Sequence, residues 1–306
     1  MGNLWLHRLS LLTACATFPL LFVGGLVTSK GAGLAVPDWP TTFGTNMFLY
    51  PWSNMVGGIF YEHSHRLVAA GVGLLTLALA FLLWIRDSRR WVRWLGVIAL
   101  ILVIAQGVVG GLRVVLLERT LAIIHGSLAQ TFFALMVSLA LFTSREWKER
   151  PQKMQMREAG RLRHLCLLTT GLIYVQGIFG AVLRYTGALL EVHLLLAFLV
   201  AVHVLLLTLR VLRTHPDRPK LARLAILLSG LLVLQLALGL GSYAGKFAPL
   251  GLALPSSAVV ILTTTHVVSG ALMLVTSLVL MLRTYRLPKS LSCLTGEQIL
   301  WYRVSA

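Results

Sequence analysis

Charged residues are scarce in this chain, and acidic ones are the scarcest. Of its 306 residues only 12% are charged, and ten Asp and Glu stand against 27 Lys and Arg. A soluble domain of this length needs far more charge to cover its surface. Here 57% of the residues are hydrophobic, and the mean hydropathy is +0.83. The shortage of charge therefore excludes an ordinary soluble domain and indicates an integral membrane protein.

Cysteine is also rare. Cys15, Cys166 and Cys293 are scattered along the chain and form neither a Cys-x-x-Cys nor a Cys-x-x-Cys-His motif. Such motifs mark thiol redox pairs and covalently attached c-type haem. The sequence therefore excludes both kinds of site.

Long apolar runs, by contrast, fill most of the sequence. Each is about the 20 residues that cross a hydrocarbon core as a helix. The first is longer than the apolar part of a signal peptide and has no clean cleavage site after it, so we expect it to be retained. The sequence predicts an all-α integral membrane protein with eight transmembrane helices, at about 8–28, 60–85, 91–112, 118–143, 164–184, 189–212, 221–243 and 257–283.

Basic residues gather on one side of these expected helices. With the N-terminus inside, the outer segments hold only six of the 27 basic residues: Lys30, Arg66, Arg113, Arg119, Arg184 and Lys246. Positive residues concentrate on the cytoplasmic side of membrane proteins. We therefore expect a multi-pass protein of the plasma membrane (the cell inner membrane) with both termini in the cytoplasm. The charge is a topology signal and not a nucleic-acid-binding surface, so the bilayer is the expected partner and nucleic acid is not.

A Gln/Gly pattern repeats on the odd-numbered runs. Gln106, Gln176 and Gln235 are each followed within four residues by glycine, and a basic segment at about 144–163 divides the chain. The sequence thus predicts two tandem four-helix bundles, 1–150 and 151–306. The glycines either let helices approach closely or leave a flat gap for a macrocycle, and the glutamines are candidate hydrogen-bond partners between helices.

Four histidines recur near the start of the even-numbered runs: His65, His125, His193 and His266. A single buried histidine more often makes a structural hydrogen bond, but four in register across a repeat favour ligation. Haem with two histidine ligands needs imidazoles from facing helices, which diagonal helices of a bundle supply. The expected pairs of axial iron ligands are His65 with His125 and His193 with His266, all towards the outer leaflet.

An acid accompanies only one of these pairs. Glu62 stands three residues before His65, so both side chains project from one helix face. Thr263 takes the equivalent place before His266. Glu62 either takes part in chemistry at the first site or forms an ion pair with Arg66, four residues later. The asymmetry suggests that one haem site performs chemistry and the other does not.

Two stretches of the sequence resemble the haem A synthase family. The first is the loop Gly31-Ala32-Gly33-Leu34-Ala35-Val36-Pro37-Asp38-Trp39-Pro40, and the second is Glu62-His63-Ser64-His65-Arg66. The resemblance extends over the chain through its eight helices, its two halves and the histidine on every even helix.

The resemblance implies an oxidoreductase acting on CH groups. Members convert the C8 methyl of haem O to a formyl group by successive hydroxylations with oxygen from water, giving haem A for terminal oxidases. It implies haem O as substrate between His65 and His125 in the N-terminal bundle, and haem b as cofactor between His193 and His266. Glu62 matches the family's catalytic carboxylate.

The resemblance also carries expectations about partners and the outer side of the molecule. A haem O synthase and an electron acceptor such as quinone are expected partners. The basic residues Lys30, Arg66, Arg113 and Arg184 are expected to contact haem propionates or the site, and the loop at about 29–59 either caps it or lies at the membrane interface. Many members carry a cysteine pair in this loop and this chain has none, which puts any thiol-dependent mechanism in doubt.

Two other functions fit four membrane histidines. One is a di-haem b cytochrome that oxidises quinol and transfers electrons without changing a porphyrin. The other is a haem carrier or exporter, for which Glu62 has no role. The loop motif and the acid on one side only favour the synthase.

Overall fold

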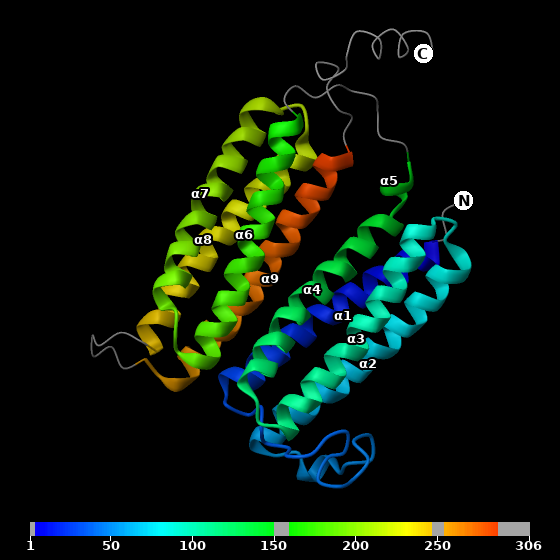
Figure 1. Ribbon diagram of the computed structural model, residues 1–306, viewed down its shortest axis with the longest axis vertical. Coiled ribbons are helices and arrows are strands. Elements are labelled where there is room, and N and C mark those ends of the chain that lie inside the picture. The colour runs from blue at the N-terminus through cyan, green and yellow to red at the C-terminus, as the bar shows by residue number, and fades with distance from the viewer. Residues whose placement is uncertain (1–3, 150–158, 247–253, 287–306) are drawn as a thin grey trace.

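The computed structural model describes residues 4–149, 159–246 and 254–286, most of which are helical (Figure 1). Two short helices, η1 (Trp52–Asn54) and α5 (Arg145–Lys148), lie in connections. The long helices are α1 (Leu4–Ser29), α2 (Gly57–Arg86), α3 (Arg90–Val115), α4 (Arg119–Thr143), α6 (Ala159–Thr186), α7 (Leu190–Thr214), α8 (Pro219–Lys246) and α9 (Ser256–Arg286). These eight are long and apolar enough to cross a membrane. The prediction of an all-α membrane protein with eight spans is therefore confirmed.

The long helices follow the predicted apolar runs, and most extend a few residues beyond them, while α4 matches its run to within one residue. Inside a bilayer the backbone has no water to bond, so a spanning segment continues as helix until it reaches the interface. Arg90 at the start of α3 and Arg286 at the end of α9 mark such polar ends. Five of the predicted inner basic residues and one cysteine lie outside the described residues: Arg150, Lys153, Arg157, Lys289, Arg303 and Cys293.

Helices α1 to α4 surround one apolar core, and α6 to α9 surround another (Figure 1). In each group every helix contacts the next one, and the last contacts the first. Helix α2 therefore lies diagonally across from α4, and α7 from α9. Diagonal helices of a bundle present side chains to each other across its centre.

The two groups meet along α1, α4, α6 and α9. Helix α1 contacts α9, and α4 contacts both α6 and α9. If α1 to α4 are matched in order with α6 to α9, the contact of α1 with α9 becomes the contact of α6 with α4. Phe133 of α4 packs against Ala271 and Val275 of α9 in an apolar cluster between the groups.

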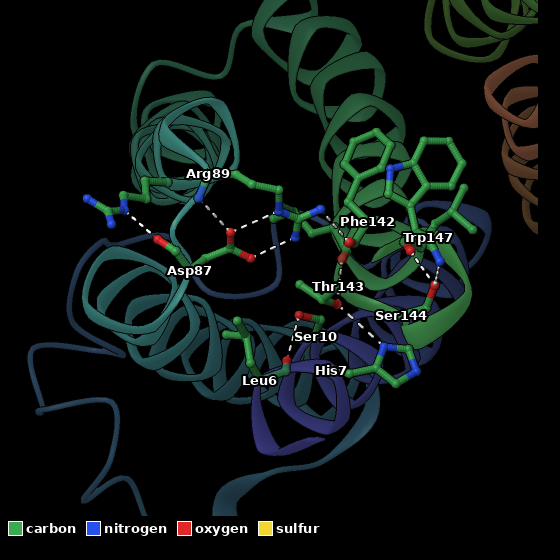
Figure 2. Close-up of polar contacts among 12 residues, drawn as sticks. Leu6, His7, Ser10, Asp87, Arg89, Phe142, Thr143, Ser144 and Trp147 are labelled. Carbon is green, nitrogen blue, oxygen red and sulfur yellow. Dashed lines mark hydrogen bonds and ion pairs between the residues drawn. The ribbon is translucent and has the colours of Figure 1, made fainter. Parts of the chain in front are cut away.

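Polar contacts tie α1 to α4 together at one end, where Asp87 occupies the turn after α2 (Figure 2). Its carboxylate accepts hydrogen bonds from the backbone N–H of Arg89 at 3.0 Å and from its guanidinium at 2.9 and 2.7 Å. Arg89 also donates to the carbonyl of Phe142 on α4 at 3.0 Å, and His7 of α1 lies 3.4 Å from the Thr143 hydroxyl. Burial alone would raise the pKa of Asp87, but the bonds from Arg89 lower it below its ordinary value of 3.8.

Glu146 of α5 joins the two groups at this same end. Its carboxylate accepts a hydrogen bond from Arg283 of α9 at 2.5 Å and lies 3.0 Å from the ammonium of Lys220 on α8. Arg286 donates to the Glu146 carbonyl at 2.8 Å. The hydrogen bond from Arg283, followed by that from Lys220, lowers the pKa of Glu146 to about 2.

Residues 30–56, the 30–56 loop, cover the opposite end of α1 to α4 (Figure 1). We call this end of the molecule the loop end. Asp38 organises the loop, since its carboxylate accepts hydrogen bonds from the Thr41 hydroxyl at 2.5 Å and from the backbone N–H groups of Phe43 and Gly44 at 2.8 Å. Burial alone would raise the pKa of Asp38, but these bonds, led by that from Gly44, lower it from 3.8 to about 2.

Candidate functional site

The four predicted histidines lie on α2, α4, α7 and α9, each within the first three turns of its helix. These turns are at the loop end of every one of the four helices. The arrangement brings two diagonal pairs to the loop end of the molecule.

Each of these imidazoles packs against a glycine of the preceding helix. A Cβ placed on Gly24 or Gly110 would lie 2.9 Å from Cε1 of His65 or His125. Gly180 and Gly239 stand in the same relation to His193 and His266, with 3.1 Å in both cases. A real Cβ at Gly24 or Gly110 would not fit without moving the ring, and at Gly180 or Gly239 the ring would have to shift by a few tenths of an ångström. Glycine is therefore what lets these rings lie in place against the neighbouring helix.

All four rings carry a buried nitrogen without a partner. Within the described residues, Nδ1 of His65, His125, His193 and His266 accepts or donates no hydrogen bond. Buried polar atoms in proteins are nearly always paired, so four orphans of one kind point to a bound group that orders these rings. Paired neutral imidazoles are the donor set of haem with two histidine ligands, and the residues present fit that group.

The second pair has a spacing suited to a shared metal. The ring centres of His193 and His266 are 6.4 Å apart, and their planes meet at 69°. Two metal–nitrogen bonds of about 2 Å each, together with the distance from each nitrogen to its ring centre, would fill this separation. His65 and His125 lie on the diagonal helices α2 and α4, backed by Gly24 and Gly110.

The repeated glutamines reach across to the histidine helices. The Gln106 side-chain amide donates to the His125 carbonyl at 3.2 Å, and that of Gln176 donates to the His193 carbonyl at 3.0 Å. The amide nitrogen of Gln235 lies 3.4 Å from Nε2 of His266. The interpretation of these glutamines as hydrogen-bond partners between helices is confirmed.

Glu62 is a buried carboxylate with both oxygens engaged. Its side chain is 5% exposed, Oε1 accepts from Arg66 at 2.8 Å and Oε2 accepts from the backbone N–H of Val36 at 3.0 Å. Arg66 also donates to the carbonyls of Val36, Asp38 and Thr41 at 3.1, 2.7 and 3.0 Å. The ion pair that the sequence offered as an alternative is present, and it fixes the 30–56 loop to α2 beside His65.

Further contacts hold the loop on α2 and α3. His63, 1% exposed, lies 3.1 Å from the Thr42 hydroxyl through Nδ1. The indole of Trp39 occupies the space that a side chain on Gly111 would need. These contacts were not foreseen, because a ring beside a distant glycine leaves no pattern in the sequence.

The four basic residues expected at propionates already have partners within the chain. The Lys30 ammonium lies 4.9 Å from the ring centre of Tyr61, and Arg113 donates to the Gly33 carbonyl at 3.0 Å. Arg66 bonds the loop as described above, and Arg184 of α6 bonds α1. Contact with propionates stays a prediction for all four.

Arg184 belongs to a polar seam between the two groups of helices. It donates to the Gly25 carbonyl at 2.8 Å and to the Ser29 hydroxyl at 2.7 Å. The Thr264 hydroxyl donates to Ser29 at 2.8 Å, and Thr28 lies 3.2 Å from the Tyr185 hydroxyl. Because Gly24 faces His65 and Gly25 faces Thr264, a single helix separates the two histidine pairs.

Two other polar residues, His203 and Glu118, lie apart from the pairs. Nδ1 of His203 bonds the Leu199 carbonyl at 2.8 Å within its own helix. Glu118 is exposed and precedes the first turn of α4. Neither contacts the four histidines in the described structure.

Comparison with known proteins supports one family. The family model COX15-CtaA, described as a cytochrome oxidase assembly protein, matches residues 7–192. The Heme A synthase of Shouchella clausii is 31% identical over 187 residues, which cover 60% of this chain and 58% of the relative. That of Bacillus pumilus is 30% identical over 188 residues, covering 58% and 59%. That of Bacillus licheniformis is 28% identical over 194 residues, covering 61% of each. The chain thus matches less than two thirds of the length of these relatives.

Proposed function

Because this chain belongs to the COX15-CtaA family of cytochrome oxidase assembly proteins, we propose that it is a haem A synthase that oxidises the C8 methyl of haem O to a formyl group. Relatives named Heme A synthase support this activity. The observation that carries the proposal is structural: two diagonal pairs of glycine-backed histidines, with a buried carboxylate beside only one pair.

The two halves of the chain take different haems. Residues 1–150 bind the substrate haem O between His65 and His125, and residues 151–306 hold haem b between His193 and His266. When bound there, haem b would supply one-electron redox chemistry. The chain's own part is to fix the imidazoles, exclude water from the bundle centre and handle protons.

The oxidation uses water as its source of oxygen. The methyl group takes up the oxygen of one water and releases two electrons and two protons, giving an alcohol. A second identical step gives a gem-diol, which loses water to leave the aldehyde. In total four electrons and four protons leave the substrate, so an external acceptor such as quinone must take the electrons.

Glu62 is the proton acceptor of this reaction. It shares a helix face with His65, and Arg66 and the Val36 N–H hold its two oxygens in place. A carboxylate fixed beside a reacting carbon takes up a released proton or orients the attacking water. Leu190, three residues before His193, and Thr263, three before His266, provide no such group.

The protein lies in the plasma membrane with both termini in the cytoplasm and the loop end outside. Basic residues near the α5 end, such as Arg86, Arg90 and Arg93, support this orientation. A haem O synthase in the same bilayer would supply its apolar substrate.

Pigment analysis tests the activity. The protein is purified from cells that make haem O, as wild type, Glu62→Gln and the control Glu118→Gln, whose acid is exposed at the same end. We expect haem A in the wild type and the control, and haem O without haem A in Glu62→Gln. Haem b alone in all three would overturn the synthase and favour a di-haem b electron-transfer cytochrome.

A further inference from the structure

One of the four glycine–histidine contacts is built differently from the other three. Four residues before Gly110, Gly180 and Gly239 stand Gln106, Gln176 and Gln235. Residues four apart lie on one helix face. Each glutamine is therefore on the same face as its glycine, one turn further from the loop end. Before Gly24, which faces His65, the same position is Leu20.

The glutamines connect their own helices to the histidine helices at the level of the imidazole rings. Those of α3 and α6 donate to the carbonyl of the histidine itself, at 3.2 and 3.0 Å. Gln235 of α8 lies 3.4 Å from the His266 ring and accepts a hydrogen bond from the Ser269 hydroxyl, one turn further along α9. No water competes for these bonds in a bilayer core, so each one fixes where its ligand helix stands.

The described residues contain no corresponding glutamine contact at His65. Leu20 is partly buried and packs with the apolar core of α1 to α4. In the described part of the chain, no side chain donates to the His65 carbonyl, and the neighbouring Glu62 and Arg66 bond the loop instead. Pro19, next to Leu20, also removes one backbone hydrogen bond from α1. The α1 backbone beside this ring is tied to α6 and α9 through Gly25 and Ser29, but at the position of the glutamines Leu20 gives it no hydrogen bond to the helix that carries His65.

We infer that Gln106, Gln176 and Gln235 are positioning residues for three axial histidines, and that His65 is a releasable ligand that lets the first site exchange its porphyrin. At the haem b site, a glutamine contacts each histidine, His193 and His266. At the haem O site, a glutamine contacts only His125. The inference rests on the proposed function only in taking haem as the ligand. Groups that orient a metal-binding histidine typically change metal affinity 10- to 100-fold.

Haem transfer to a scavenger tests this without any turnover. The purified protein is loaded with haem b at both sites in lipid nanodiscs and mixed with excess apomyoglobin, and the Soret band follows the loss of haem. We expect a fast phase that His65→Ala abolishes and a slow phase that His193→Ala abolishes. Leu20→Gln should slow the fast phase at least tenfold, and Gln176→Leu should accelerate the slow phase 10- to 100-fold.

Each outcome decides the question. An unchanged slow phase in Leu20→Gln shows that this variant remains folded. Gln176→Leu tests the role of the glutamines independently, because it replaces a polar side chain by an apolar one. Leu12→Gln, on the exposed side of the same helix, should leave both phases unchanged. The purified protein could hold only one haem. In that case, a His65→Ala variant that keeps this haem and a His193→Ala variant that loses it support the inference, and the opposite result overturns it. Equal release rates in the wild type also overturn it. Because only haem b is used, a protein without synthase activity can still pass this test, and a working synthase can fail it.

Discussion

At the scale of single residues, the recurring unit is a glycine on one helix facing an imidazole on the next. In the four contacts, the distance from a hypothetical glycine Cβ to Cε1 of the imidazole is 2.9 to 3.1 Å. A close-packed interior cannot absorb an added methyl there without moving the ring. The position of each imidazole therefore depends on the absence of a side chain on the neighbouring helix.

Replacing Gly110 by alanine should displace His125. The new Cβ would meet Cε1 at 2.9 Å and Nδ1 at 3.2 Å, and overpacking of this kind costs about 1–3 kcal/mol. We expect a lower haem content and an altered low-spin EPR signal. Gly107→Ala on the same helix is the control, since nothing lies within 4 Å of its Cβ. Unchanged spectra in Gly110→Ala would contradict this account of the glycine.

At the scale of elements, the 30–56 loop is held by hydrogen bonds that converge on Arg66. This guanidinium donates hydrogen bonds to three loop carbonyls and to the Glu62 carboxylate. Its side chain is 10% exposed and that of Glu62 is 5% exposed, so the pair is largely shielded from water. The loop is thus an extension of α2 and not an independent segment.

Arg66→Met should release the loop from α2. Removing one partner of a buried ion pair costs about 3 kcal/mol or more, and the loop carbonyls lose their donors as well. Amide hydrogen exchange of residues 31–56 should accelerate, by about a hundredfold at the Val36 amide, with an intermediate effect in Arg66→Lys. Arg119→Met, exposed at the same end, is the control. Equal exchange in Arg66→Met and wild type would show that the loop is held elsewhere.

The loop should also loosen in acid through Asp38. The pKa of this carboxyl is lowered from 3.8 to about 2 in the folded loop. A group with a lowered pKa stabilises the fold above its unfolded pKa, and this contribution is lost as the pH falls through the folded value. Exchange of the loop amides, corrected for the intrinsic pH effect, should therefore rise between about pH 4 and pH 2. Asp38→Asn should remove this step, and its persistence in that variant would assign the step to another group.

Sequence reasoning reached the elements and the histidines but not the contacts around them. Eight helices were predictable because a bilayer demands about 20 apolar residues per span. His65 and its three counterparts were predictable because they repeat. The ion pair of Arg66 with Glu62 was open to prediction, but the bonds of Arg66 to the loop were not, since their acceptors are backbone carbonyls, which every residue has. The seam through Ser29 and Thr264 was equally hidden, because hydroxyl side chains are common within membrane helices.

At the scale of the whole molecule, two groups of helices are joined at both ends. The seam around Arg184 joins them at the loop end, and Glu146 with Arg283 joins them at the α5 end. Polar contacts in these two places, with the apolar cluster of Phe133 between them, fix the distance between the histidine pairs.

Cysteine labelling should establish the orientation of this assembly. In a chain whose own cysteines are replaced, Phe48→Cys in the exposed loop should react with an impermeant maleimide on intact cells. Ser88→Cys, exposed in the turn after α2, should react only after permeabilisation. The basic residues beside Ser88 and their scarcity at the loop end give this direction. The opposite pattern would invert the proposed topology.

The exchange of contacts between the two groups is what a two-fold symmetric dimer would produce. Matching α1 to α4 with α6 to α9 turns the α1–α9 contact into the α6–α4 contact and leaves α4–α9 in place, as in an isologous interface. A homodimer, however, must carry identical sites in both subunits. Joining two such subunits into one gene removes that constraint. Glu62 and Leu20, present in one half without a counterpart in the other, are differences that a homodimer could not carry.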